Sequence, residues 1–257
     1  MNFVQVLILS IIEGITEFLP ISSTGHLILA SDILRISQTE FQKSFEIIIQ
    51  LGAILSVVVI YFQTLVQNRK IWMKVLVAFI PTGVLGLVLY KFIKQYLLGN
   101  TAVVLISLMI GGILLIILEK IHNEEKSDLD SINKIGLKNA FLIGLFQSVS
   151  MIPGVSRAAA TIFGGLFLGL KRKTAVEFSF LLAVPTMLSA SVFDLYKSHL
   201  NFTSYDYLLL TIGFFGAFVT AYFTVKYFLR YIQNHNFIPF GVYRIILAIA
   251  FWLLILK

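Results

Sequence analysis

The chain has 257 residues, of which 58% are hydrophobic and 13% are charged, and its formal net charge is +7. This composition excludes a soluble globular enzyme and a disordered segment. Long unbroken apolar runs exclude a barrel of membrane strands, whose residues would alternate in polarity. The positive charge indicates basic loops at a cytoplasmic membrane surface, with no nucleic acid partner. The sequence therefore predicts an all-α polytopic membrane protein that forms a single integral membrane domain over 1–257.

The first apolar stretch, residues 1–34, contains two acids and starts without Lys or Arg, so we expect it to remain in the mature protein. It is too long for one membrane helix and too short for two. The segment Pro20-Ile-Ser-Ser-Thr-Gly25 interrupts its middle. A proline that removes a backbone donor, followed by hydroxyls that cap a new helix, is typical of a re-entrant hairpin. A second such stretch, 136–171, is broken at Pro153-Gly-Val-Ser156.

Six transmembrane helices are predicted besides the two re-entrant hairpins. Each run is long enough to cross about 30 Å of hydrocarbon. A polar segment, Glu119–Lys138, separates the third run from the second hairpin and is the predicted linker. The six runs are 45–66, 73–94, 100–119, 174–195, 205–228 and 238–256.

An internal repeat relates the two parts of the chain. Landmark residues recur at offsets of 130 or 131, and this divides the chain into halves of about 1–125 and about 132–257. Each half holds one hairpin and three spans, and three is odd, so the second half enters the bilayer from the opposite side. An inverted-topology repeat of this kind brings the two hairpin tips together near the midplane. The landmarks are His26 with Arg157, Glu46 with Glu177, Gly83 and Gly86 with Gly213 and Gly216, and Gly111 with Gly241.

Basic loop residues predict the orientation of the chain. The face that carries both termini has six Lys and Arg residues, and the opposite face has twelve. Because cytoplasmic loops are enriched in positive charge, both termini are predicted to be non-cytoplasmic.

Glu13 and Glu17 lie one helical turn apart, so both carboxylates project from one face of the first helix. Two close carboxylates are unfavourable without a shared proton or a cation between them. A divalent cation, Mg²⁺ or Ca²⁺, held by these carboxylates, water and a phosphate would satisfy both. The alternative is one protonated carboxyl that packs against a neighbouring helix.

Hydroxyls and an arginine follow the two breaks. Ser22, Ser23 and His26 follow Pro20. Helix-start hydroxyls with free backbone N–H groups attract anions, and histidine can move a proton near neutral pH.

Ser156 and Arg157 follow the second break, and the planar guanidinium suits phosphate. Thr161, one turn further on, can donate to the same anion. The alternatives are hydroxyls that bond the preceding turn and an ion pair between Arg157 and Glu13 or Glu17. Glu46, Glu177 and Arg244 are interpreted as groups that support the site residues or form structural pairs.

Two motifs, Glu13-Gly-Ile-Thr-Glu17-Phe-Leu-Pro-Ile-Ser-Ser-Thr-Gly-His26 and Pro153-Gly-Val-Ser-Arg157, resemble the signatures of the undecaprenyl-diphosphate phosphatases, the bacitracin-resistance membrane phosphatases of bacteria. Segments around Phe45-Glu46, Glu177–Pro185 and Phe237–Arg244 are also similar, so the resemblance covers nearly the whole chain. One departure is Ala158, where the family's second motif usually has serine.

The resemblance implies a polyprenyl diphosphate lipid substrate, a bacterial plasma membrane location and hydrolysis of undecaprenyl diphosphate to the monophosphate and inorganic phosphate. This reaction recycles the lipid carrier for peptidoglycan and other cell-wall polymers and gives bacitracin resistance. A homodimer is compatible with the sequence. The residues suit phosphoryl transfer, which depends mainly on positioning and charge neutralisation. Glu13 and Glu17 are predicted to bind the metal, and Arg157, Ser22, Ser156 and Thr161 to bind phosphate. The predicted catalytic residues are Glu17, Ser23, His26 and Arg157. The nucleophile is left open between Ser23, His26 and activated water.

A transporter or flippase of a phosphorylated polyprenyl lipid is the alternative. Inverted repeats, broken helices and charges at the midplane are typical of transporters, which would also use the arginine. A carboxylate pair beside a serine and histidine cluster is not needed for transport. That cluster therefore favours the enzyme.

Overall fold

The computed structural model describes residues 1–37, 39–97, 100–197 and 202–255. Within these ranges the regular structure is helical, apart from one isolated β-bridge between Leu129 and Leu170. Five helices are long and apolar enough to cross a membrane. The chain is therefore a multi-pass membrane protein, as the sequence predicts. These helices are α3 (Glu40–Ile60), α5 (Arg69–Phe92), α6 (Thr101–Ile121), α9 (Arg172–Lys197) and α10 (Ser204–Tyr231).

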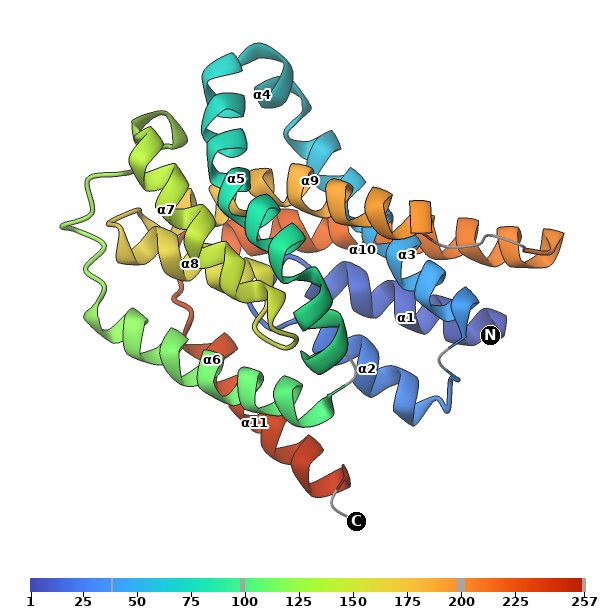
Figure 1. Cartoon of the computed structure of the whole chain (residues 1–257). Helices are drawn as coiled ribbons and strands as arrows, with labels where there is room; N and C mark the ends of the chain where they lie inside the picture. Colours follow the sequence, from blue (N-terminus) through green and yellow to red (C-terminus); the bar gives the residue numbers. More distant parts are fainter. Residues whose placement is uncertain (38, 98–99, 198–201, 256–257) are drawn as a thin grey trace.

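The sixth predicted span, 238–256, corresponds to α11 (Ile238–Ile255). Residue 256 lies outside the described residues. Over Ile238–Leu253, α11 belongs with the shorter apolar helices of the chain. It packs along α6, and the two helices form one edge of the molecule (Figure 1).

Each of the two apolar stretches with a central break forms a pair of short helices. α1 (Phe3–Thr16) and α2 (Ser23–Ile33) form the first pair, and α7 (Leu137–Ser148) and α8 (Arg157–Phe167) the second. The helices have 14, 11, 12 and 11 residues, in that order. At about 1.5 Å per residue, none is long enough to cross the hydrocarbon alone. The turns of the two pairs point toward each other at the centre of the molecule (Figure 1).

The first long helix ends earlier than predicted. α3 stops at Ile60 instead of continuing to residue 66, and Tyr61 separates it from α4 (Phe62–Gln67). No glycine or proline lies at this break. The indole of Trp72, at the start of α5, donates to the Leu65 carbonyl at 2.6 Å, so one carbonyl of the short helix is bonded from outside it.

The hairpins pack against helices of the opposite half. α1 packs against α10, and α7 packs against α5. Gly14 and Gly144 lie at these two contacts, 130 residues apart. A Cβ on Gly14 would lie 2.8 Å from the Ala217 carbonyl oxygen, and a Cβ on Gly144 would overlap the Ala78 carbonyl. Both approaches require glycine, so the two contacts are built alike.

The number of residues that separates matching positions of the two hairpins is larger after their breaks than before them. Ser22 and Ser156 each cap the second helix of a pair, and they lie 134 residues apart. The predicted match of His26 with Arg157 is therefore wrong. Arg157 is the first residue of α8, whereas His26 is the fourth residue of α2. The second break is longer because a 3₁₀ turn, Val149–Met151, follows α7.

The linker is shorter than predicted and is anchored to both of its neighbours. α6 continues to Ile121, and the segment before α7 contains a 3₁₀ turn, Ile132–Lys134. Glu119 forms a buried ion pair with Arg172 and accepts from the backbone N–H of Phe237 at 3.1 Å. This carboxylate therefore ties α6 to the starts of α9 and α11.

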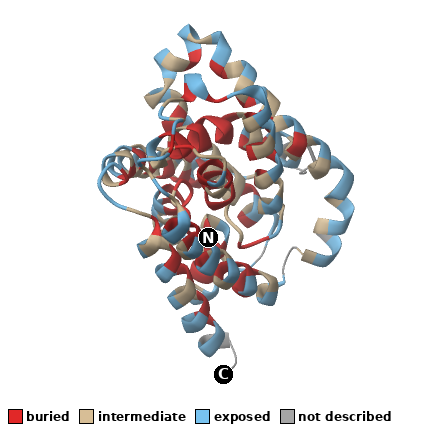
Figure 2. Cartoon of the chain, turned by 90° about the vertical axis from the view of Figure 1, so that its left-hand side faces the viewer, coloured by how far each residue is buried: buried red, intermediate tan, exposed pale blue. Residues whose placement is uncertain are grey.

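Figure 2 shows buried residues gathered inside the helix bundle and exposed residues around it. Many of the exposed residues are large and apolar. The main core includes Phe18 beside the first break and Phe178 and Phe180 on α9. Leu87 and Val88 on α5 are 71% and 72% exposed, as expected for side chains that face lipid. Buried polar side chains, among them Glu17 at the first break, lie within the same interior.

Candidate active site at the two helix breaks

The second helix of each hairpin begins at a serine with an unusual backbone. Ser22 and Ser156 have φ of 72° and 75°, a region that favours glycine. The Ser22 hydroxyl accepts from the Gly25 N–H at 3.3 Å, and that of Ser156 accepts from the Ala159 N–H at 3.1 Å. Both side chains cap their helices, and both line the same cavity. Sequence reasoning placed them correctly at helix starts.

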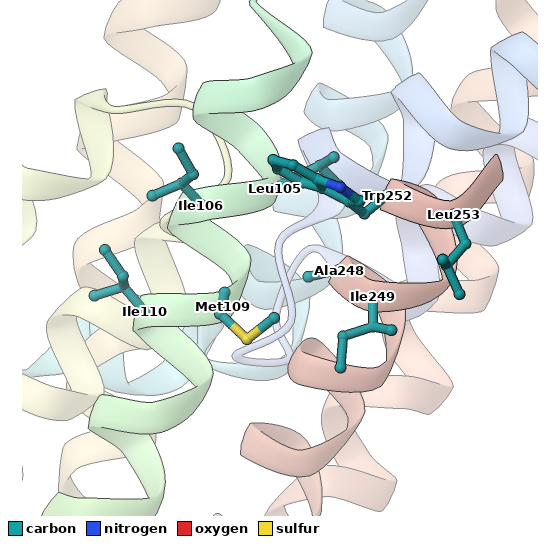
Figure 3. Close-up of a pocket in the computed structure, with 8 residues that line it drawn as sticks. All are labelled: Leu105, Ile106, Met109, Ile110, Ala248, Ile249, Trp252 and Leu253. Carbon is teal, nitrogen blue, oxygen red and sulfur yellow. The ribbon is translucent and has the colours of Figure 1, made fainter. Parts of the chain in front are cut away.

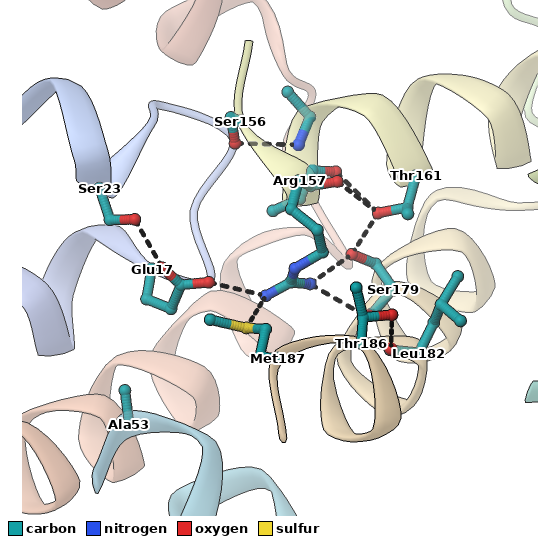
Figure 4. A network of polar contacts seen from close by, with 12 residues as sticks. Glu17, Ser23, Ala53, Ser156, Arg157, Thr161, Ser179, Leu182, Thr186 and Met187 are labelled. Carbon is teal, nitrogen blue, oxygen red and sulfur yellow. Dashed lines mark hydrogen bonds and ion pairs between the residues drawn. The ribbon is translucent and has the colours of Figure 1, made fainter. Parts of the chain in front are cut away.

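Glu17, Ser23 and Arg157 form a continuous set of contacts across the breaks (Figure 4). The Ser23 hydroxyl donates to Glu17 Oε2 at 2.5 Å, and Arg157 Nη2 donates to Glu17 Oε1 at 3.1 Å. The Glu17 and Arg157 side chains are only 4% and 10% exposed. Shielding from water strengthens both charged contacts. The carboxylate therefore holds the hydroxyl and the cation at the same time.

Arg157 is held from several sides. Its Nη1 donates to the Ser179 carbonyl at 3.0 Å and to the Ser179 hydroxyl at 3.2 Å. Its Nη2 lies 3.6 Å from the sulfur of Met187, and its Cζ lies 5.5 Å from the centre of the Phe18 ring. The Nε is buried and has no partner among the described residues. Arg157 therefore lines the cavity as a fixed charge with one unused donor.

Thr161 lies behind Arg157. Its hydroxyl is within hydrogen-bond distance of the Arg157 carbonyl at 2.9 Å and of the Ser179 hydroxyl at 2.6 Å, and the residue is 1% exposed. It is not among the residues that line the cavity. Thr161 is predicted to contact phosphate. In the structure it instead supports Arg157 through Ser179. Ala158 is fully buried beside it, where a serine hydroxyl would face the core.

Glu13 lies one turn before Glu17 on α1 and is 1% exposed. Both of its carboxylate oxygens are buried without a hydrogen-bond partner in the described part of the chain. Among the described residues, no three His, Cys, Asp or Glu side chains gather as a metal site. A hard divalent cation takes carboxylate oxygens and keeps part of its hydration shell, so the unpartnered Glu13 oxygens and the cavity-lining Glu17 one turn away fit such an ion. Glu13 and Glu17 are the residues that would hold it.

The ring nitrogens of His26 are bonded to neither Glu17 nor Ser23. Its Nδ1 lies 2.7 Å from the Ser22 carbonyl, which can only accept, and its Nε2 lies 2.7 Å from the hydroxyl of Tyr243 on α11. Both ring nitrogens are therefore engaged. The histidine does not line the cavity. Of the predicted catalytic residues, the structure brings together Glu17, Ser23 and Arg157, and places His26 against α11.

A cavity of about 780 Å³ opens beside Glu17, Ser23 and Arg157. Side chains of α5 and α9 line it, together with polar residues of the two breaks. Its size and mixed lining suit an amphipathic ligand. A smaller pocket of about 250 Å³ between α6 and α11 has eight lining side chains, all apolar or aromatic, and so offers no head-group contacts (Figure 3).

Several polar residues at the site were not predicted. Ser179 lies in an apolar run on α9, and Gln147 on α7 donates to Thr82 at 2.8 Å and to Thr186 at 3.1 Å. Gln147 lies 130 residues after Glu17, so the repeat offset was the signal that could have found it. Arg244 forms no ion pair among the described residues and donates instead to backbone carbonyls of the two breaks.

The fold and the site define a helical membrane protein in which a buried carboxylate, a serine and an arginine line one cavity together with apolar side chains. Its sequence matches the family described as bacitracin resistance protein BacA over residues 6–250, and the chain belongs to that family.

Relatives across the full length carry one name. A protein of Sulfurihydrogenibium sp. is 53% identical over 253 residues, with 98% of this chain and 99% of the relative covered. One of Aquifex aeolicus is 51% identical over 247 residues, with 96% of both covered. One of Persephonella marina is 49% identical over 256 residues, with 100% of both covered. Each is named undecaprenyl-diphosphatase.

Proposed function

We propose that this protein hydrolyses undecaprenyl diphosphate to undecaprenyl phosphate and inorganic phosphate, and so recycles the lipid carrier for cell-wall polymers and gives bacitracin resistance. The observation that carries this proposal is the contact of Ser23 with Glu17, and of Glu17 with Arg157, at the end of the cavity. Transport of a phosphorylated lipid would use the arginine, but not a serine bonded to a buried carboxylate. The name shared by full-length relatives supports the same activity.

Ser23 is the nucleophile that the geometry favours. Its oxygen attacks the terminal phosphorus, and its proton passes to Glu17 Oε2, which already accepts that hydrogen bond. The bond from the terminal phosphorus to the bridging oxygen breaks, and undecaprenyl phosphate leaves. Glu17 passes the proton to this departing phosphate and is a carboxylate again. Water then attacks the phosphoserine and gives a proton to Glu17, the bond from phosphorus to the Ser23 oxygen breaks, Glu17 returns the proton to that oxygen, and inorganic phosphate leaves. His26, held by Tyr243, keeps α2 in place beside this centre.

Arg157 neutralises and orients the phosphate oxygens, together with Ser22 and Ser156 at the helix starts. Thr161 contributes through Ser179 and so fixes the guanidinium.

In the mutant Arg157→Lys the charge remains but the planar fork is lost. We expect kcat/KM to fall by about 10²- to 10³-fold, measured as phosphate release. The control Arg69→Lys, at an exposed residue that begins α5, should retain wild-type activity. Equal activity of Arg157→Lys and the control would remove Arg157 from the mechanism.

A divalent cation, Mg²⁺ or Ca²⁺, is the proposed cofactor, held by Glu13 and Glu17. Such an ion would neutralise charge on the transferred phosphate. Its support is the pair of buried Glu13 oxygens without protein donors.

Glu13→Gln keeps the shape of the side chain and removes its charge. After chelator treatment, we expect this mutant to need at least about tenfold more cation than wild type for half-maximal phosphate release. Glu125→Gln, in the exposed linker, is the matched control. Full activity of the wild type in excess chelator, or an unchanged cation requirement in Glu13→Gln, would argue against the ion.

The proposed membrane arrangement has α11 as a sixth span, the two short-helix pairs as re-entrant hairpins and the two halves in inverted topology. Similar packing of α1 on α10 and of α7 on α5 supports it. With both termini outside the cytoplasm, the ends of α5 and α9 near Tyr90 and Asp194 face the same side. These residues also line the cavity. The lipid head therefore enters from the non-cytoplasmic side of a bacterial plasma membrane.

Phosphate release from undecaprenyl diphosphate by the purified protein in detergent tests the proposed activity. We expect one phosphate per substrate, with undecaprenyl phosphate as the lipid product. Folded protein that releases no phosphate but moves labelled lipid between leaflets of a vesicle would support the transporter instead.

A further inference from the structure

Arg244 lies at the junction of the two helix breaks and α6. It is fully buried, and its guanidinium donates to five backbone carbonyls. Arginine has five N–H donors, so every donor is used. Two acceptors belong to α6, one to the first break and two to the second. They are Ser107 at 3.0 Å, Leu108 at 3.3 Å, Pro20 at 3.2 Å, Gly154 at 3.0 Å and Val155 at 2.9 Å.

The acceptors in the breaks lie directly beside the residues of the site. The Val155 carbonyl belongs to the peptide that joins Val155 to Ser156, so its bond to Arg244 fixes that peptide plane. Pro20 lies between Glu17 and Ser23 on the only covalent path that joins them. Arg244 therefore contacts the backbone on the approach to both α2 and α8.

Both capping serines have strained backbones, with φ of 72° and 75°. A non-glycine residue in this region costs about 1–3 kcal/mol and persists only where its surroundings hold it. The Arg244 contacts provide that restraint at both serines, since they fix a carbonyl within two residues before each one. One side chain thus restrains both strained helix starts.

The surrounding helices leave room for this guanidinium. A Cβ on Gly111 would overlap Arg244 Nη2 and lie 2.8 Å from its Cζ. A Cβ on Gly112 would lie 2.6 Å from the carbonyl oxygen of Gly241, on the helix that carries Arg244. Two adjacent glycines therefore let α11 approach α6 and admit the planar group between them.

We propose that Arg244 is a positioning residue for the phosphatase reaction, which sets the placement of Ser23 relative to Arg157 through the backbone of the two breaks. This inference rests on the proposed function. Arg244 touches neither substrate nor reacting atoms. Lysine in its place would offer three donors on a flexible stem and could not bond both breaks and α6 together.

Arg244→Lys and Gly111→Ala test the proposal by kinetics. A displacement of about 1 Å at reacting groups lowers the rate by about 10²-fold. We therefore expect kcat to fall by about 10²-fold in Arg244→Lys with KM within about threefold of wild type. Gly111→Ala keeps the arginine and displaces it, so it should show the same pattern to a smaller degree even if Arg244→Lys does not insert. Arg230→Lys, at an exposed residue, and Gly136→Ala, where an added Cβ meets nothing within 4 Å, are the matched controls.

A distance measurement separates positioning from other effects. The chain has no cysteine, so spin labels can be placed with Ile33→Cys on α2 and Phe167→Cys on α8, at residues that are 72% and 63% exposed. We expect the distribution of distances between the labels to broaden in Arg244→Lys and Gly111→Ala and to stay unchanged in the controls. A lower kcat with an unchanged distribution, or wild-type kcat in both variants, would overturn the proposal. A wild-type protein without phosphatase activity would refute the proposed function alone, because the distances are measured independently of turnover.

Discussion

Replacing Ser23 by alanine is expected to lower kcat on undecaprenyl diphosphate by on the order of 10⁴-fold. The Ser23 hydroxyl is bonded to Glu17 at 2.5 Å and lines the cavity, so its loss removes the attacking oxygen while the phosphate-binding groups remain. KM should therefore change much less than kcat. Phosphate release under saturating substrate measures both constants.

Thr24→Ala is the matched control for Ser23→Ala. Thr24 is the next residue on α2, is exposed and also lines the cavity, but it has no hydrogen bond to Glu17 in the described structure, so the control removes a neighbouring hydroxyl from the same helix turn. We expect it to retain kcat within about tenfold of wild type. If Ser23→Ala kept a similar share of its activity, Ser23 would not be the nucleophile.

Glu17→Gln is expected to lower kcat by about 10³- to 10⁴-fold, which is the upper part of the range for loss of a general base. Glutamine keeps the size of the side chain but cannot take the proton of Ser23. It also leaves Arg157 buried without its carboxylate partner, and breaking a buried pair destabilises the fold by about 3–5 kcal/mol. Thermal unfolding should therefore shift downward together with the loss of activity.

A double mutant separates the two effects of Glu17. Because Glu17 and Arg157 are in contact at 3.1 Å, the losses in Glu17→Gln with Arg157→Lys should be far from additive. The matched substitution Glu124→Gln changes a carboxylate that pairs with Arg172 outside the site, and it should leave kcat unchanged. Strictly additive losses would mean that Glu17 and Arg157 act independently.

Local sequence signals predicted the helix breaks and the residues that begin the helices beyond them. Proline and hydroxyl residues interrupt an apolar run at Pro20 and Pro153, and their effects on the backbone are local. Glu17 and Arg157 are predicted because charges at membrane depth need partners, and Ser23 because hydroxyls at a helix start attract an anion. The structure brings these three together.

Long-range contacts could not be predicted from such signals. Ser179 supports Arg157 from an apolar helix 22 residues away, and the Tyr243 hydroxyl meets His26 across 217 residues. Arg244 bonds only backbone carbonyls, which carry no residue-specific pattern in the sequence. The repeat offset was misplaced at His26 because the second break holds an additional 3₁₀ turn.

The most direct test of the central claim is to trap the phosphoserine. Purified protein is mixed with undecaprenyl diphosphate, quenched in acid within one turnover and digested for mass spectrometry. We expect a phosphate on the peptide that contains Ser23, absent from Ser23→Ala and from protein quenched without substrate. Rapid phosphate release with no phosphate on Ser23 at any time point would contradict attack by this serine.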